Sequence, residues 1–279
     1  MYKSLGPGMI GLECSFPEAA SLASEHGFAA IQVDVEYLQA VGPSDYRSIL
    51  DREELRNGSA GLPFRFDADE EPFEEGLAQL DGLAETLTEI GCDRLSTWVL
   101  SFSDERAYED NFTFHKNRIS RVAAVLEAHD LELALEFLGP ETMRAGHEYR
   151  FIASVPEMLE LCEAIPASNV GVLLDSWHWY TAGNPDPALA ALTSENVVDV
   201  HVNDAPDRPR SEQIDSERLL PATSGVIEID RFLQRLADLG YDGPVTVEPF
   251  NDELEALSDE AAVAETAESL DRAFQQAAV

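Results

Sequence analysis

Short apolar runs alternate with longer amphipathic segments along almost the whole chain. The runs are rich in Val, Leu and Ile, which is typical of buried strands. The longer segments repeat their apolar residues at the spacing of one helix face. This alternation predicts βα units and a parallel sheet. We expect eight strands, near Met9–Cys14, Ala30–Val35, Ala60–Phe66, Arg94–Leu100, Glu132–Phe137, Val170–Asp175, Val197–His201 and Val245–Glu248.

Proline and glycine mark the ends of the predicted helices. The segment from Pro17 to His26 stops at Gly27, and the segment from Pro72 to Ile90 stops at Gly91. Proline in the first turn and glycine just past the last turn are expected at helix ends. Further helices are predicted near residues 109–129, 229–239 and 259–276.

The number of βα units and the chain length agree on one architecture. Eight units in 279 residues have the size of one (β/α)8 TIM barrel. We therefore predict an α/β fold with a single domain over residues 1–279. One long stretch, Asn203–Ser224, lacks periodicity and is rich in Asp, Arg, Pro and Ser. A loop of this length is usually functional, and we expect it to cover the mouth of the barrel.

Four of the predicted strands carry a potential metal ligand at or near their carboxyl ends. The runs are LALEF, GVLLD, VVDVH and PVTVE, and the residues are Glu136, Asp175, His201 and Glu248. An α/β barrel places its chemistry at this end of its strands. Three carboxylates and one imidazole suit one divalent ion, with Mn²⁺ expected and Mg²⁺, Co²⁺ or Zn²⁺ possible. Two glutamates could also divide acid and base roles across one substrate.

Each candidate also has an ordinary structural interpretation. A buried glutamate could pair with a neighbouring arginine. Asp175 could cap the following helix, and His178 of the D-x-x-H motif could pack beside Trp177 and Trp179. A lone His201 would usually be structural. The occurrence of all four candidates on successive strand ends favours a mononuclear metal centre.

The chain is strongly acidic, and this limits its partners. Its 54 acidic and 18 basic residues give a formal net charge of -36, and only Lys3 and Lys116 are lysines. Such a composition is typical of proteins from salt-loving archaea, because dense carboxylates keep a protein hydrated in concentrated salt. The alternative is an unusually acidic protein from an ordinary cell. A surface this negative repels phosphate backbones and anionic lipids, so neither nucleic acid nor membrane is an expected partner.

Cysteine usage and the lack of a long apolar segment predict a cytoplasmic protein. Cys14, Cys92 and Cys162 lie far apart and form no CxxC pair, which favours reduced core thiols. The first residues lack the apolar region of a signal peptide. No apolar run approaches the length of a membrane span.

The segments LALEFLGP, GVLLDSWHWY, VVDVHVNDA and LGYDGPVTVEPF resemble a known family. The chain looks like the xylose isomerase-like TIM-barrel superfamily of sugar (phosphate) isomerases and epimerases. This superfamily includes ketose 3-epimerases and inosose isomerases and dehydratases, and the resemblance covers nearly the whole chain. It implies that Glu136, Asp175, His201 and Glu248 hold one divalent metal. It also implies that His178 contacts a substrate oxygen and that Glu136 and Glu248 exchange a substrate C–H proton.

The implied activity is isomerisation or epimerisation of a sugar or cyclitol α-hydroxy ketone through a metal-bound enediolate. Dehydration of an inosose-like substrate at the same site is the alternative. The implied partner is a small molecule, and a homodimer would agree with the family.

Two features depart from the family pattern. Members often carry a Pro-Gly-acid-Gly turn before the seventh helix, where this chain has residues 221–225, Pro-Ala-Thr-Ser-Gly. Epimerases of the family also use an arginine shortly after the metal-binding histidine. Arg208, Arg210 and Arg218 are all candidates by spacing. We choose Arg208 and Arg218; the alternative is that they pair with nearby carboxylates.

Three rival functions are less consistent with the sequence. AP endonucleases of the same superfamily bind three zinc ions and need histidines on the third and fourth strand ends. Those ends read LPFRFDAD and LSTWVLSFSD here. A zinc peptidase would need a motif such as H-E-x-x-H, which the sequence lacks. A non-catalytic sugar-binding barrel is the third alternative, because a fold does not fix a function.

Overall fold

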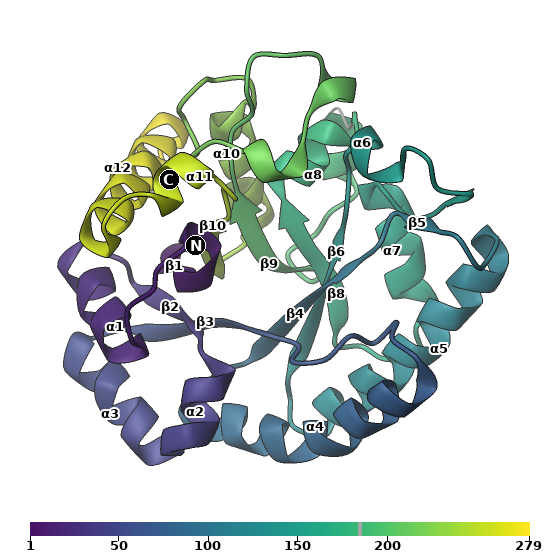
Figure 1. Ribbon diagram of the computed structural model, residues 1–279, viewed down its shortest axis with the longest axis horizontal. Helices are drawn as coiled ribbons and strands as arrows, with labels where there is room; N and C mark the ends of the chain where they lie inside the picture. The colour runs from purple at the N-terminus through teal and green to yellow at the C-terminus, as the bar shows by residue number, and fades with distance from the viewer. Residues whose placement is uncertain (184–185) are drawn as a thin grey trace.

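The described strands close into one parallel barrel in a computed structural model (Figure 1). The structure describes residues 1–183 and 186–279, without the side chains of 186 and 187. Around the barrel the order of strands is β1-β10-β9-β8-β6-β4-β3-β2. The bounds are β1 (Tyr2–Leu5), β2 (Ala30–Val33), β3 (Arg56–Gly61), β4 (Arg94–Val99), β6 (Glu132–Phe137), β8 (Val170–Asp175), β9 (Val197–Val202) and β10 (Pro244–Val247). The predicted TIM barrel is confirmed.

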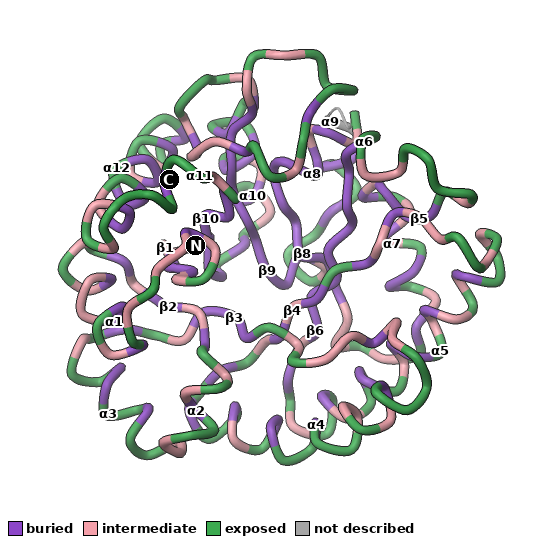
Figure 2. Tube along the Cα trace, in the orientation of Figure 1, coloured by how far each residue is buried: buried purple, intermediate pink, exposed green. Residues whose placement is uncertain are grey.

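Helices surround the strands, and their inner faces are buried while their outer faces are exposed (Figure 2). Their bounds are α1 (Phe16–Glu25), α2 (Val35–Val41), α3 (Pro43–Glu53), α4 (Glu70–Ile90), α5 (Tyr108–Glu127), α6 (Glu141–Arg144), α7 (Val155–Ala164), α8 (Ser176–Thr181), α9 (Asp186–Ala190), α10 (Ile229–Leu239), α11 (Asp252–Glu255) and α12 (Asp259–Ala277). Short elements complete the chain: β5 (Phe102–Ser103), which pairs with β7 (Tyr149–Arg150), and the 3-10 turns η1 (Pro7–Ile10), η2 (Arg210–Glu212) and η3 (Asp215–Glu217). None of the described helices is long and apolar enough to cross a membrane.

The helix ends follow the sequence signals. Ser15 and Glu18 form a capping box at the start of α1. The last turn of α4 ends at Gly91 and that of α10 at Gly240, both with positive φ (78° and 81°). Glycine adopts this left-handed conformation without the steric cost that a Cβ would bring.

Two of the predicted strands were misplaced. The first strand is Tyr2–Leu5, not Met9–Cys14, because Pro7 and the left-handed Gly11 instead form the turn η1. The third strand is Arg56–Gly61, not Ala60–Phe66, because Pro63 offers no N–H to a central ladder. The other six predicted strands agree with the structure to within two residues at each end.

Strand register brings the candidate residues to one end of the barrel. Asp175 is paired with His201 across β8 and β9, and His201 with Thr246 across β9 and β10. Glu248 follows β10 directly, and Glu136 is the last residue but one of β6. Residues paired in a parallel ladder point to the same face, so these side chains face the barrel interior near its carboxyl-terminal end.

The loop after β9 folds back on itself. Backbone hydrogen bonds join Asp204 and Leu219 in both directions, at 2.8 and 2.9 Å. The Asp204 side chain then accepts N–H bonds from the turn that departs from the family pattern. The donors are Thr223, Ser224, Gly225 and Ile227. One buried carboxylate thus holds both ends of the loop, which explains how the turn keeps its place without the family's Pro-Gly-acid-Gly residues.

A substitution at Gly139 tests the close contact between the end of β6 and α8. A Cβ at this position would lie 2.1 Å from the backbone oxygen of His178 and 2.9 Å from the nitrogen of Ala182. We expect Gly139→Ala to lower the free energy of unfolding by roughly 1–3 kcal/mol, because backbone must move to admit the methyl group. Urea denaturation measures this.

Gly82→Ala in α4 is the matched control. A Cβ there would meet nothing within 4 Å. This change should raise the free energy of unfolding by about 0.5–1 kcal/mol, since it removes a glycine from a helix interior. Equal effects of the two substitutions would contradict the packing described for Gly139.

Candidate metal centre

Four buried side chains from four elements of the barrel converge on one point. They are Glu136, Asp175, His201 and Glu248, and one potential ligand atom of each lies within 4.8 Å of the other three. His201 Nδ1 is 3.3 Å from Glu248 Oε2 and 3.9 Å from Glu136 Oε1. The sequence-predicted ligand set therefore comes together in space.

Several atoms of this cluster have no hydrogen-bond partner among the described residues. They are Glu136 Oε1 and both ring nitrogens of His201. A buried polar atom without a partner costs about 1–3 kcal/mol, so native proteins rarely leave several together. Glu136 Oε1 and His201 Nδ1 face the same point as the other ligand atoms, whereas His201 Nε2 faces Asp199. A divalent cation would satisfy Glu136 Oε1 and His201 Nδ1, and a set of three oxygens and one nitrogen has the chemistry that such a cation binds.

Burial and mutual repulsion perturb the carboxylates of the cluster. Burial raises the pKa of Glu136 well above its usual range, and the charges of Glu248 and Asp175 raise it further. Burial would also raise the pKa of Glu248, but His201 and Arg218 more than offset it and lower that pKa. The pKa values of two carboxyl groups in one cavity are thus shifted in opposite directions.

The pKa of the His201 imidazole is raised. Burial lowers its pKa, but the Glu248, Asp199 and Glu136 carboxylates outweigh burial and raise that pKa to about 10. Asp199 lies two residues earlier on β9, and its Oδ2 is 4.0 Å from His201 Nε2. Nδ1 of the ring therefore faces the cluster, while Nε2 faces Asp199.

Asp175 has two roles at the start of α8. Its Oδ1 accepts a hydrogen bond from the backbone N–H of His178 at 2.9 Å, so it caps the helix as one interpretation of the sequence predicts. Its Oδ2 accepts a hydrogen bond from Asn203 Nδ2 at 2.8 Å and lies 3.5 Å from Arg218 Nη1. The cap fixes the carboxylate against the cluster, so the two interpretations do not exclude each other.

Arg218 is the cation at the centre of the cluster. Its side chain comes from the loop after β9 and is only 1% exposed. Nη1 donates to Glu248 Oε2 at 2.9 Å, and Nη2 donates to Asp215 Oδ1 at 2.8 Å. Nη2 is also 3.1 Å from His178 Nε2. The predicted arginine thus lies against the candidate ligands and the D-x-x-H histidine.

His178 faces the cluster from the first turn of α8. Its Nε2 lies 3.9 Å from Glu136 Oε1, and its Nδ1 accepts the backbone N–H of Gly139 at 3.2 Å. Gly139 N–H and Arg218 Nη2 thus contact the two ring nitrogens from opposite sides. Burial and the charge of Arg218 lower the pKa of His178 well below its usual range, so the ring is neutral. Trp177 and Trp179 belong to the hydrophobic core.

The other candidate arginines lie elsewhere. Arg208 pairs with Glu217 in the same loop, and both side chains are partly exposed. Arg210 stacks on Tyr180, with its guanidinium carbon 4.9 Å from the ring centroid. The structure does not bring Arg208 to the cluster, so the substrate-binding role assigned to it stays a prediction.

Three polar residues support the cluster, although the sequence predicted none of them as a ligand or a substrate-binding residue. Asn203 donates to Asp175, and its Oδ1 accepts the backbone N–H of Glu248 at 3.2 Å. Asp215 holds Arg218, and Asp199 lies behind His201. Asn203 directly follows the strand that carries His201, which is the one sequence signal that could have marked it.

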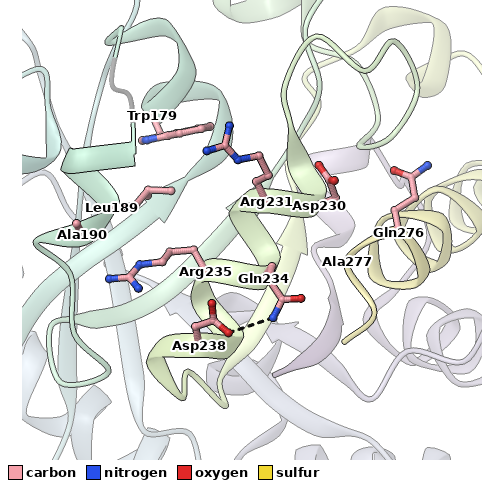
Figure 3. Close-up of a pocket in the computed structure, with 10 residues that line it drawn as sticks. All are labelled: Trp179, Leu189, Ala190, Asp230, Arg231, Gln234, Arg235, Asp238, Gln276 and Ala277. Atoms are coloured by element: carbon pink, nitrogen blue, oxygen red, sulfur yellow. Dashed lines mark hydrogen bonds between the residues drawn. The ribbon is translucent and has the colours of Figure 1, made fainter.

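The cluster opens into a cavity of about 150 Å³. Its lining includes Glu136, His201 and Glu248 on one side. A larger cavity of about 510 Å³ lies on the outer surface between α9, α10 and α12 (Figure 3). Its lining carries Arg231 and Arg235 but no convergent set of buried carboxylates and histidines. Perturbed titratable groups mark the smaller cavity as the candidate active site.

Comparisons with known proteins agree with this geometry. The family model of the xylose isomerase-like TIM barrel matches residues 20–273. An inosose isomerase of Bacillus subtilis is 24% identical over 202 residues, which cover 72% of this chain and 70% of that protein.

Two solved structures share the fold over the full chain. A xylose isomerase domain protein of Alicyclobacillus acidocaldarius is 30% identical with a TM-score of 0.90, and the match covers 100% of both chains. The IolI protein, solved with a bound zinc atom, is 20% identical with a TM-score of 0.84, and the match covers 100% of this chain and 98% of IolI. The chain therefore belongs to the xylose isomerase-like TIM barrel family.

Proposed function

We propose that the protein is a divalent-metal-dependent isomerase or epimerase of a sugar or cyclitol α-hydroxy ketone. The observation that carries the proposal is the convergence of Glu136, Asp175, His201 and Glu248 on one point inside the barrel mouth. The similarity to inosose isomerase supports the substrate class. Dehydration of an inosose-like substrate at the same site is the alternative activity.

The four convergent residues would hold the ion, and Mn²⁺ is our first choice because oxygen donors predominate. Mg²⁺, Co²⁺ and Zn²⁺ are the other candidates, and zinc is the ion in the IolI structure. When bound, the ion supplies Lewis-acid polarisation of a substrate carbonyl. One ion is proposed, because the described residues contain a single group of this kind.

The two glutamates are suited to opposite proton transfers. Glu248, with its lowered pKa, is ionised and can accept a proton from the carbon next to the carbonyl. The electron pair of that C–H bond then forms the C=C bond of an enediolate. Glu136, which faces the same point from β6, can deliver a proton taken up from solvent to carbon. Return to the same carbon from the other face epimerises it, and return to the neighbouring carbon interconverts ketose and aldose.

His178 and Arg218 would bind the substrate. The neutral His178 ring presents its Nε2 to the cluster, where it can form a hydrogen bond with a substrate hydroxyl group. Arg218 holds Glu248 in place through a 2.9 Å hydrogen bond. If the carbon beside the enediolate carries a hydroxyl that leaves as water, the same residues carry out the dehydration.

The setting of the enzyme is also a proposal. Free Cys14, Cys92 and Cys162 favour a reducing cytoplasm, and the acidic, lysine-poor surface favours a halophilic source. A net charge of -36 disfavours nucleic acid and anionic membrane as partners, and with them a nuclease activity. We propose one domain over residues 1–279 and leave a homodimer as the family expectation.

Replacing either glutamate should stop the proton transfer. We expect Glu248→Gln and Glu136→Gln each to lower exchange of substrate C–H with deuterated solvent by at least ~10²-fold, because the amide cannot accept or return the proton. Mass spectrometry of the ketone measures the exchange. Metal content is measured alongside, and the exposed Glu268→Gln is the control. Full exchange in both active-site variants would disprove the assigned roles.

Metal binding should release protons. His201, with a pKa of about 10, and Glu136, with a raised pKa, are both protonated at neutral pH, so the ion must displace their protons. We expect about one to two protons per Mn²⁺ at pH 7, and an affinity that increases with pH toward 10. Calorimetry in buffers of different ionisation enthalpy counts the protons. Binding without proton release would contradict this electrostatic description.

Salt should stabilise the protein. Added KCl screens repulsion among the surface carboxylates, so the urea midpoint should rise steadily between about 0.1 and 1 M KCl, where the Debye length falls from ~10 to ~3 Å. A midpoint that is unchanged over this range would argue against the halophilic interpretation.

A further inference from the structure

The wall of the active-site cavity opposite the candidate ligands carries no charge. Its described side chains include Met9 from η1, Gln32 from β2, Leu62 after β3, and Ser96 and Trp98 from β4. Lysine and arginine are both missing from the described lining. The two carboxylates of the lining, in contrast, are Glu136 on β6 and Glu248 directly after β10.

The arginines near the site already have partners. Arg218 pairs with Asp175, Glu248 and Asp215 and is buried beneath them. Arg65 lies over the Trp98 ring at 4.6 Å, but its guanidinium makes two hydrogen bonds to the carboxylate of Asp67, at 2.8 and 2.6 Å. A phosphate or carboxylate group on a substrate would have to compete with these carboxylates for the guanidinium groups.

This distribution of charge favours neutral substrates over anionic ones. Sites that bind phosphate use arginine, lysine or a helix N-terminus, because a desolvated anion without a partner is costly. Here an anionic group would meet a wall without lysine or arginine, in a cavity lined by Glu136 and Glu248 and in a chain of net charge -36. A neutral substrate avoids both the repulsion and the unpaired charge.

The uncharged wall matches the two kinds of surface on a polyhydroxylated ketone. Trp98 is 43% exposed and is paired with Glu136 across β4 and β6, so its indole is accessible at the rim beside the proposed proton donor. Met9 and Leu62 add apolar surface for C–H groups. The Gln32 amide has no hydrogen-bond partner among the described residues, so its donors and acceptor are free for hydroxyl groups.

Cavity size and backbone geometry agree with a small substrate. The 150 Å³ volume is below the ~300–1,000 Å³ of drug-sized ligand sites. Gly6 keeps this wall in place, because a Cβ there would lie 2.8 Å from Met9 Sδ and 3.1 Å from Gln32 Oε1. A larger residue at position 6 would push both side chains into the cavity.

We propose that the substrate is a neutral, unphosphorylated polyhydroxy ketone of ketose or cyclitol size, and that Gln32 and Trp98 determine this specificity. The proposal deepens the proposed function and rests on it. Trp98 and the apolar side chains take the C–H face of the molecule, and Gln32 and Ser96 take hydroxyl groups away from the reacting carbons.

Matched pairs of substrates test the proposal. Manganese-loaded protein is incubated in deuterated solvent with D-fructose and D-fructose 6-phosphate, with D-ribulose and D-ribulose 5-phosphate, and with scyllo-inosose. Deuterium gained at carbon is then followed. We expect exchange with at least one neutral ketone, at a kcat/KM at least 100-fold above that of any phosphorylated ketone. A phosphorylated ketone that reacts as well or better overturns this inference and leaves the proposed function intact. Exchange with none of the five overturns the proposed function, and this inference with it.

Variants of the uncharged wall test the assigned residues. Gln32→Ala should raise KM for the preferred ketone at least tenfold with little change in kcat, because it removes binding contacts but no proton carrier. Gln32→Arg should narrow the preference for neutral over phosphorylated ketone at least tenfold. Calorimetric titration with the neutral and the phosphorylated ketone gives an independent measure of binding. An unchanged KM and an unchanged preference would show that Gln32 does not contact the substrate.

Discussion

Three carboxylates and an imidazole are buried together at one end of the barrel, and the rest of the site depends on balancing their charges. In a low-dielectric interior, like charges a few ångströms apart cannot all stay ionised without compensation. Arg218 compensates one carboxylate, and a protonated His201 compensates another. The third carboxylate has no such partner, and the pKa of Glu136 is therefore raised. A divalent cation in place of the two displaceable protons would satisfy the same set of groups.

The loop after β9 supplies much of this compensation. Arg218 reaches the cluster because Asp204 pairs with Leu219 and holds the turn at residues 223–227. Asn203, at the start of the same loop, links Asp175 to Glu248. The candidate ligands and the loop therefore belong to one hydrogen-bond network. Residues far apart in the sequence together position the carboxylates.

The sequence was sufficient to predict the barrel and the cluster for a physical reason. Parallel strands buried on both faces show as continuous apolar runs, and a charged residue at the carboxyl end of such a run is typical of the barrel mouth. β1 was missed because Lys3 and Ser4 interrupt its apolar pattern. Spacing could not choose between Arg208 and Arg218, since the choice depends on where the loop returns, and the Asp204–Leu219 pairing sets that point. The uncharged wall could not be predicted from the sequence either, because it combines residues from four separate segments.

The most direct test of the central claim is the metal content of the purified protein. The chain would be purified in molar KCl without chelator, supplied with Mn²⁺, desalted and analysed by elemental mass spectrometry beside a His201→Ala variant. We expect about one divalent ion per chain, lost in the variant. No bound metal in the unmodified chain, or equal retention in the variant, would mean that the four convergent residues do not form a metal centre.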